Sequence, residues 1–263
     1  MVGTINLKSF TAEQVRTARA ASSCHRYVSP VISKAPERIA RLAGYQDYEE
    51  MSLSYELHFN AGRMIDIPAS FYPIYLSAPD NYKKTPSYYR AVEITLDLLF
   101  GHKLKESQGI QLASNYGPFL AYLQEQRGIS GLIGVDTDPI AVQYAEQNGL
   151  PVIKADVRNL PFPDYSQDVV ISGLFLDPWY LRIIADFSGY GRGEEDAFLK
   201  DVLSETYRVL KPGGCLISLH EWFVHPNEKK TEWHPFSRSQ FFSQEAINDF
   251  LSLEDIAVLQ KPF

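Results

Sequence analysis

The sequence lacks the features of a disulfide-stabilised, metal-dependent or membrane-spanning protein. Its 263 residues include two cysteines, Cys24 and Cys215, which are too few for a disulfide scaffold. The six histidines show no spacing typical of metal ligands, so we expect no metal site. No apolar run reaches the roughly eighteen residues that a membrane span needs, and the first residues have no signal-peptide core. We therefore expect a cytoplasmic protein with no membrane contact.

The chain also has fewer basic than acidic residues. The chain carries 25 Lys and Arg against 32 Asp and Glu, a net charge of −7. Proteins that bind nucleic acid through its phosphates usually have the opposite excess, so we do not expect a nucleic-acid partner. Apolar residues make up 45% of the chain, which is enough to build a buried core.

The segment from Gln108 to Val170 alternates short apolar runs with stretches of helical periodicity. The apolar runs cover 109–113, 132–135 and 152–155, a length that suits buried strands. Strands that alternate with amphipathic helices predict an α/β fold with a doubly wound, mostly parallel sheet. In such a fold, ligands bind outside the carboxyl ends of the strands.

The first apolar run ends in a turn, ASNYG, at residues 113–117. Asn115 and Gly117 both tolerate positive φ, which permits a sharp turn close to a ligand. Pro118 suits the first position of a helix because it has no N–H to lose there. The free N–H groups at the start of that helix would favour a carboxylate or a phosphate.

Acids follow the next two predicted strands. Asp136 lies about twenty residues beyond the turn, where an acid can accept hydrogen bonds from ribose hydroxyls; the alternative is a surface acid in a loop. Asp138 is expected to cap the following helix. Asp156 could accept a hydrogen bond from an adenine amino group while the backbone amide of Val157 contacts a ring nitrogen. Taken alone, Asp156 would be interpreted as a turn-forming acid, and its place after the third strand of the series favours the ligand role.

Three stretches carry a resemblance to a known family: VDTDP (135–139), ADVRNLPFPDYSQDVVIS (155–172) and RVLKPGGCLISLHEW (208–222). Over roughly residues 86–221 the chain resembles the class I S-adenosylmethionine-dependent methyltransferases. The resemblance implies a Rossmann-like methyltransferase domain at 86–263, with S-adenosyl-L-methionine as the cofactor. It also implies the residues that hold this cofactor: Gln111, Ala113, Asn115, Gly117, Asp136, Thr137, Asp156, Val157 and Ser172.

The turn departs from the family pattern, which is usually an acid, an apolar residue and Gly-x-Gly-x-Gly. Here Gln111 replaces the acid, Ala113 and Asn115 replace two glycines, and Gly117 is kept. The family's acid normally helps to hold the charged amino-acid end of the cofactor, whereas Gln can form a hydrogen bond without charge. A methyltransferase-like module that binds a ligand or partner without catalysis is therefore a second hypothesis. A nucleotide-dependent oxidoreductase is a third, although the turn lacks Gly-x-Gly-x-x-Gly.

Candidate catalytic residues follow the fourth and fifth predicted strands: Asp177 and Trp179 in LFLDPWY, and His220 in HEWF. His220 could act as a general base or orient a substrate, and a loop histidine is the alternative. DPWY is similar to the Asp-Pro-Pro-Tyr signature of amino methyltransferases that act on bases, but it lacks the second Pro. It also starts several residues too late for the strand tip, and an Asp cap before a helix opened by Pro is the favoured explanation.

Residues 1–85 form a predicted helical, aromatic-rich N-terminal cap. Thr11 begins a capping-box pattern, and Pro36 is expected to open a helix that ends at Gly44. The cap would either close over the cofactor and select the substrate, or cover the sheet or form a dimer surface. Candidate residues for an aromatic wall are Tyr72, Tyr75, Tyr82, Tyr88 and Tyr89.

The partner that we expect is a small-molecule methyl acceptor, with a protein substrate and a homodimer left open. The end of the sheet is also open. After Phe250 only IAVLQ (256–260) is predicted to form a strand, whereas the family's sheet usually ends in a hairpin. Either the sheet is one strand short or WFVHP (222–226) completes it.

Overall fold

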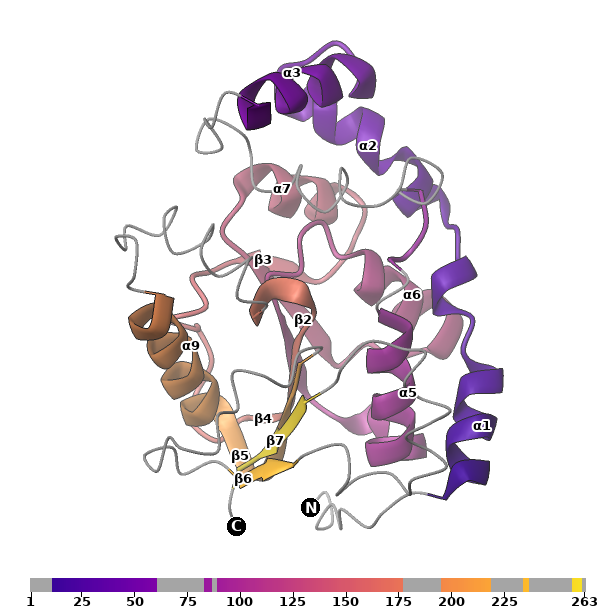
Figure 1. The fold of residues 1–263 in the computed structure, drawn as a ribbon, viewed down its shortest axis with the longest axis vertical. Coiled ribbons are helices and arrows are strands. Elements are labelled where there is room, and N and C mark those ends of the chain that lie inside the picture. The colour runs from indigo at the N-terminus through magenta and orange to yellow at the C-terminus, as the bar shows by residue number, and fades with distance from the viewer. Residues whose placement is uncertain are drawn as a thin grey trace.

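The computed structural model describes residues 11–60, 83–86, 89–176, 195–218, 234–236 and 257–261. Its centre is a seven-stranded sheet in the order β3-β2-β1-β4-β5-β7-β6, with helices on both faces (Figure 1). The parallel part contains β1 (Gly109–Leu112), β2 (Leu132–Asp136), β3 (Val152–Lys154), β4 (Gln167–Ser172) and β5 (Leu210–Ser218). This confirms the predicted doubly wound, mostly parallel Rossmann-like sheet.

The order of the strands reverses between β1 and β4. From β1 the chain builds outward to β2 and β3, then returns to the other side of β1 to form β4 and β5. At such a reversal the connections that leave the two strands diverge, which opens a crevice at the carboxyl ends of the strands. The residues after β1 and β4 are therefore the place to look for a ligand.

The antiparallel edge of the sheet is neither one strand short nor completed by residues 222–226. β7 (Ala257–Gln260) pairs with β5, and the outermost strand, β6, comes from His234–Phe236 rather than from 222–226. β6 is only three residues long and contains Pro235. An edge strand can hold a proline because one side of it forms no ladder, but so short a segment has no recognisable strand pattern in the sequence.

Each face of the sheet has its own helices and its own buried side chains. On one face, α5 (Tyr89–Phe100) and α6 (Pro118–Arg127) cover Val169, Ile171 and Cys215. On the other face, α9 (Glu195–Val209) packs over the alternate residues of the same strands, Ile110, Val170 and Leu216 among them. Strands buried on both faces explain the continuous apolar runs in the sequence. Figure 1 shows α9 on one side of the sheet and α5 and α6 on the other.

The N-terminal helices are α1 (Ala12–Ala21), α2 (Pro30–Leu42) and α3 (Tyr48–Asn60), with a short 3-10 turn, η1 (Cys24–Arg26), after α1. Thr11 forms the predicted capping box with Gln14. The predicted helix start at Pro36 is wrong. The helix begins at Pro30, where Ser29 accepts a hydrogen bond from the amide of Ile32 (3.1 Å), and Pro36 lies inside it. A serine cap followed by proline is the stronger start signal.

A buried carboxylate ties the N-terminal helices to the helices on the sheet. Glu93 of α5 is 1% exposed. It accepts hydrogen bonds from the hydroxyls of Ser22 (2.5 Å) and Tyr122 (2.6 Å) and from Arg127 (2.5 Å). A buried charge requires such partners because its desolvation is costly. The division at residue 85 stays a prediction, and the contact between Ser22 and Glu93 crosses it.

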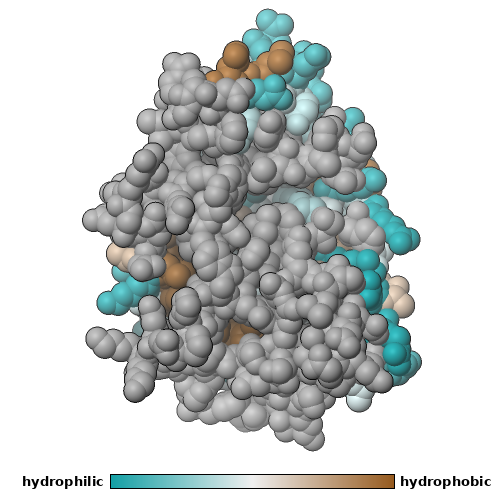
Figure 2. All heavy atoms as spheres, viewed as in Figure 1, coloured by the Kyte–Doolittle hydropathy of each residue, from teal (hydrophilic) through white to brown (hydrophobic). Residues whose placement is uncertain are grey.

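The surface of α3 carries an apolar pair. Figure 2 shows hydrophobic side chains at the top of the molecule, over α3, where Leu53 and Leu57 are 56% and 69% exposed. They lie one helical turn apart and so share one face of the helix. Among the described residues, no helix has the length and apolar character of a membrane span.

Candidate cofactor-binding site

The turn after β1 has an unusual backbone. Ala113 (φ 46°), Asn115 (φ 53°) and Gly117 (φ 79°) all have left-handed conformations, one at every second position. These are the positions at which the sequence motif of the resembling family has glycine. An L-residue other than Gly loses roughly 1–2 kcal/mol in this conformation. The chain therefore keeps the course of a glycine-rich turn although two of the three glycines are replaced.

The tip of β2 supports this turn. The carboxylate of Asp136 accepts hydrogen bonds from the backbone amides of Asn115 (2.7 Å) and Asp138 (3.0 Å). The amide of Ser114 donates to the carbonyl of Val135 (3.0 Å). Gly134 in β2 is required because a Cβ there would lie 2.3 Å from Ser114 Oγ. These contacts offset the local strain of the turn.

The carboxyl group of Asp136 titrates abnormally. Its pKa is raised to about 6, chiefly because burial disfavours the charged form; the backbone amides that donate to it act in the opposite direction. Asp138 caps α7 (Pro139–Gln147), as predicted, by accepting a hydrogen bond from the amide of Ile140 (2.8 Å). Thr137, between the two acids, is exposed. The ribose role of Asp136 stays a prediction.

Helix α6 begins at the same edge of the sheet. Its N-cap residue is Gly117, which has no side chain to cap the helix, and Pro118 occupies the first turn as predicted. Since the first amides of a helix have no partners within the helix, they favour an anionic group. This helix start lies directly after the turn.

Gln111 is the only side chain of the site that comes from within β1. It is fully buried, and its Nε2 donates a hydrogen bond to the hydroxyl of Tyr89 (2.6 Å), the first residue of α5. The ring of Tyr89 stacks on Phe119 of α6, with 4.5 Å between the ring centroids. Within the described part of the chain, Gln111 Oε1 has no hydrogen-bond partner.

Asp156 lies two residues beyond β3 and forms an ion pair that sequence reasoning missed. Arg158 donates to its carboxylate through Nε (2.9 and 3.1 Å) and Nη2 (2.5 Å). This guanidinium lowers the pKa of Asp156. Arg158 also lies 5.7 Å from the ring centroid of Phe198 in α9. Val157, between the two charges, is buried. Any adenine contact of Asp156, which stays a prediction, would have to share the carboxylate with Arg158.

The ends of β4 and β5 carry two buried hydroxyl groups. Ser172 and Ser218 are adjacent in the register of these strands, and both are at most 1% exposed. Neither hydroxyl has a hydrogen-bond partner among the residues that the structure describes. A buried hydroxyl without a partner is destabilising, which makes both groups candidates for a ligand contact.

The predicted catalytic residues Asp177, Trp179 and His220 lie outside the described residues. η4 (Leu174–Leu176) ends one residue before Asp177, and β5 ends two residues before His220. Among the aromatic-wall candidates, Tyr72, Tyr75, Tyr82 and Tyr88 are likewise outside, and Tyr89 is described. The described residues contain no group of His, Cys, Asp or Glu that could hold a metal ion.

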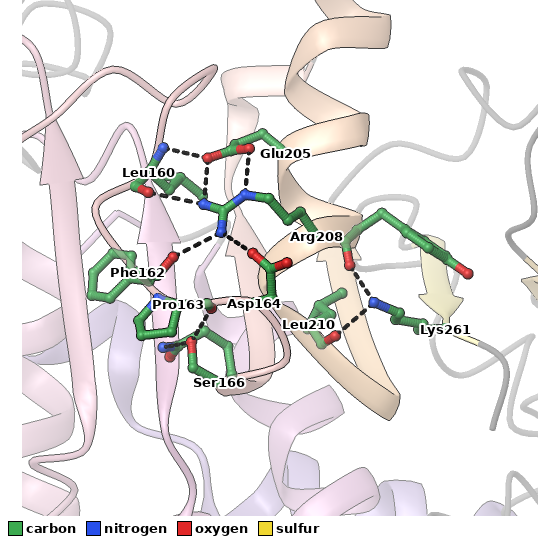
Figure 3. A network of polar contacts seen from close by, with 11 residues as sticks. Leu160, Phe162, Pro163, Asp164, Ser166, Glu205, Arg208, Leu210 and Lys261 are labelled. Atoms are coloured by element: carbon green, nitrogen blue, oxygen red, sulfur yellow. Dashed lines mark hydrogen bonds and ion pairs between the residues drawn. The ribbon is translucent and has the colours of Figure 1, made fainter.

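Arg208 explains why LPFPD and RVLKPGG occur together in the sequence. Its guanidinium donates to the carbonyls of Leu160 (3.0 Å) and Phe162 (2.9 Å) and to the carboxylates of Asp164 and Glu205 (2.6 Å each), as Figure 3 shows. The end of α9 thereby fixes the loop that leads into β4. These two family-like sequence stretches therefore include residues that support the sheet.

Part of the chain is similar in sequence to known proteins. Residues 110–218 match a family model described as a methyltransferase domain. The match covers less than half of the chain, and over these residues the chain is similar to the class I S-adenosylmethionine-dependent methyltransferases. The cofactor that the family implies is S-adenosylmethionine.

Two curated methyltransferases are similar to the chain over part of their length. The phthiotriol/phenolphthiotriol dimycocerosates methyltransferase of Mycobacterium leprae is 27% identical over 148 residues, 53% of this chain and 47% of that protein. The demethylmenaquinone methyltransferase of Thermus thermophilus is 33% identical over 116 residues, 42% of this chain and 45% of that protein. The chain thus spans about half the length of the curated relatives that it matches.

A solved structure of a SAM-dependent methyltransferase from Thermotoga maritima is also similar, with 16% identity and a TM-score of 0.37. The similarity covers 81% of this chain and 99% of that one.

Proposed function

We propose that the chain transfers a methyl group from S-adenosylmethionine to a small-molecule acceptor. The observation that carries this proposal is the left-handed run at Ala113, Asn115 and Gly117, held by Asp136 at the switch point of the sheet. A glycine-like backbone at this position allows a ligand to approach the sheet closely. Replacement of two of the three glycines should favour another backbone conformation unless other contacts, such as those of Asp136, maintain the left-handed one.

Candidate partners for the different parts of the cofactor are present among the described residues. The start of α6, whose N-cap residue Gly117 has no side chain, suits the carboxylate of its amino-acid part. Gln111 Oε1 is a buried acceptor without a partner among the described residues and suits the ammonium group. The carboxylate of Asp136 suits the ribose hydroxyls. Asp156, Val157 and Ser172 complete the predicted site on the neighbouring strands.

When bound, S-adenosylmethionine supplies an electrophilic methyl group on its sulfonium sulfur. The protein would contribute chiefly position: it would hold the acceptor in line with the methyl group and exclude water. Asp177, Trp179 and His220 follow the strands that face this space, and His220 would take a proton from a hydroxyl or amine acceptor. The acidic net charge and the two relatives, whose names give small-molecule acceptors, support a small molecule as the substrate.

A calorimetric titration of the chain with S-adenosylmethionine, S-adenosylhomocysteine and NAD⁺ tests the proposal. We expect the first two to bind at one site and NAD⁺ not to bind. A panel of acceptors with methyl-labelled cofactor then tests transfer. Binding of NAD⁺ alone would replace the proposal with the oxidoreductase hypothesis.

A second candidate function is a methyltransferase-like module that binds without catalysis. The observation that favours it is Gln111, which gives the site a neutral amide where the family has a charged acid. Cofactor binding without transfer to any acceptor of the panel would support this candidate.

A further inference from the structure

Gln111 and Tyr89 form a contact between the sheet and the first helix that covers it. The amide nitrogen of Gln111 donates to the Tyr89 hydroxyl at 2.6 Å. Gln111 is the third of the four residues of β1 and Tyr89 is the first residue of α5, so this contact places the start of α5 near the carboxyl end of β1. α6 begins at the same end and on the same face. The contact therefore borders the predicted position of the cofactor's amino-acid part.

The contact leaves one half of the amide without a partner. Gln111 is 0% exposed, and its Oε1 accepts no hydrogen bond in the described part of the chain. A buried acceptor without a donor is destabilising and rare in folded proteins. A ligand that brings a donor to this oxygen removes the cost, and a cationic donor forms the stronger hydrogen bond.

We propose that Tyr89 is a positioning residue that orients the Gln111 amide, so that its oxygen accepts a hydrogen bond from the ammonium group of the cofactor. This inference rests on the proposed function and adds a specificity determinant to it. The site then recognises the amino-acid end of the cofactor through a hydrogen bond to the neutral amide of Gln111. The resembling family has a charged acid at this position.

Orientation matters because the two ends of an amide differ. With the amide turned over, its NH₂ group would face the ammonium, and two donors would oppose each other. By holding the nitrogen, the Tyr89 hydroxyl keeps the oxygen turned toward the ligand. A carboxylate has two equivalent oxygens and needs no such orientation. The role of Tyr89 should therefore exist only while position 111 carries an amide.

Two ligands separate the amino-acid end from the rest of the cofactor. S-adenosylhomocysteine carries it, whereas 5′-methylthioadenosine has the same nucleoside and thioether without it. We would titrate both into the wild type, Tyr89→Phe, Gln111→Glu and the double variant. Tyr89→Phe keeps the ring that stacks on Phe119.

The matched control is Tyr122→Phe. Tyr122 lies on the same face of the sheet, and its buried hydroxyl donates to Glu93 at 2.6 Å rather than to Gln111. It loses a comparable hydrogen bond, so it reports the general effect of removing a buried hydroxyl. Thermal unfolding of every variant, measured alongside, identifies any that fail to fold.

We expect Tyr89→Phe to weaken S-adenosylhomocysteine binding about five- to tenfold, which corresponds to the free energy of one hydrogen bond. The same variant should weaken methylthioadenosine binding by less than about twofold. Gln111→Glu should strengthen the binding of S-adenosylhomocysteine alone, and the double variant should match it. Tyr122→Phe should change neither affinity.

Equal weakening of both ligands by Tyr89→Phe, or a double variant as weak as Tyr89→Phe, would overturn the inference. If the wild type binds both ligands with equal affinity, the nucleoside site stands and the inference fails. If the wild type binds neither, the proposed function fails with it.

Discussion

The carboxylate of Asp136 accepts a hydrogen bond from the backbone amide of Asn115 at 2.7 Å, which joins the tip of β2 to the turn that follows β1. One side chain thus holds the left-handed turn and is also the predicted ribose ligand. A single substitution at Asp136 should therefore affect both the turn and the ligand.

Asp136→Ala should weaken S-adenosylhomocysteine binding by about 1–3 kcal/mol, the cost of losing hydrogen bonds to a buried partner. Isothermal titration of the folded variant measures the change. Glu49→Ala, at an exposed position of α3, is the control and should bind like the wild type. Unchanged affinity in folded Asp136→Ala would remove the ribose assignment.

The raised pKa of Asp136, about 6, predicts a pH dependence of binding. The carboxylate accepts hydrogen bonds from ribose hydroxyls, and the protonated acid has lost part of that capacity. Below pH 6 the ligand must therefore expel a proton, and the affinity should fall by up to about tenfold per pH unit. Titrations from pH 5 to 8 test this, and Asp136→Asn should give a flat profile. A wild-type profile that is flat through pH 6 would contradict it.

The same shift affects folding in the opposite direction. The pKa of Asp136 is raised in the folded state from an ordinary value of 3.8 to about 6. The protonated form is thus favoured by folding. Its contribution to stability is fully present below about pH 4 and is lost as the pH rises through 6. The charged form that the ligand needs is therefore the less stable form of the free protein.

Ala113→Gly should stabilise the protein by about 0.5–1 kcal/mol, because relief of the left-handed strain exceeds the added entropy of the unfolded chain. Denaturation in urea measures the change. Ala141→Gly makes the same chemical change inside helix α7, where Ala141 is buried, and should destabilise by about 1 kcal/mol or more. Destabilisation by both variants would show that Ala113 is not strained.

Much of this turn could be predicted from the sequence because its signals are local. Asn115 and Gly117 are residue types that accept positive φ, and Pro118 and Asp138 each mark the start of a helix. The buried strands were visible as short apolar runs. In each case a few neighbouring residues determine the local conformation.

The remaining features depend on contacts between distant residues or on side-chain conformation. The hydrogen bond from Gln111 to Tyr89 joins residues 22 positions apart, and no local sequence pattern predicts it. Arg158 reaches Asp156 only through the conformation of its own side chain. The positive φ of Ala113 runs against its residue type, so the surrounding contacts impose it.

Ser172→Ala should raise thermal stability and lower cofactor affinity. The Ser172 hydroxyl is buried without a partner among the described residues, so its removal should stabilise the free protein by about 1 kcal/mol. If the cofactor satisfies this hydroxyl, the same change should weaken binding. Ser218→Ala is the matched control, since Ser218 is its register neighbour and has no assigned contact with the cofactor. Equal loss of affinity in both variants would show that the two hydroxyls act together, and no loss in either would remove Ser172 from the site.

His220→Ala should lower the rate of methyl transfer and leave the affinity for S-adenosylhomocysteine nearly unchanged. The reason is position: β5 ends at Ser218, so His220 follows a strand that ends at the same edge as the cofactor turn. A histidine there could accept the proton that a hydroxyl or amine acceptor releases when it gains a methyl group. Loss of a general base typically lowers the rate by about 10²–10⁴-fold. The measurement is turnover with the best acceptor from the panel, together with binding of S-adenosylhomocysteine.

Because His220→Gln keeps a polar side chain without a basic nitrogen, it should be as slow as His220→Ala if the residue is a base. Full activity in His220→Gln alone would leave His220 with an orienting role, and full activity in both variants would exclude it from the reaction.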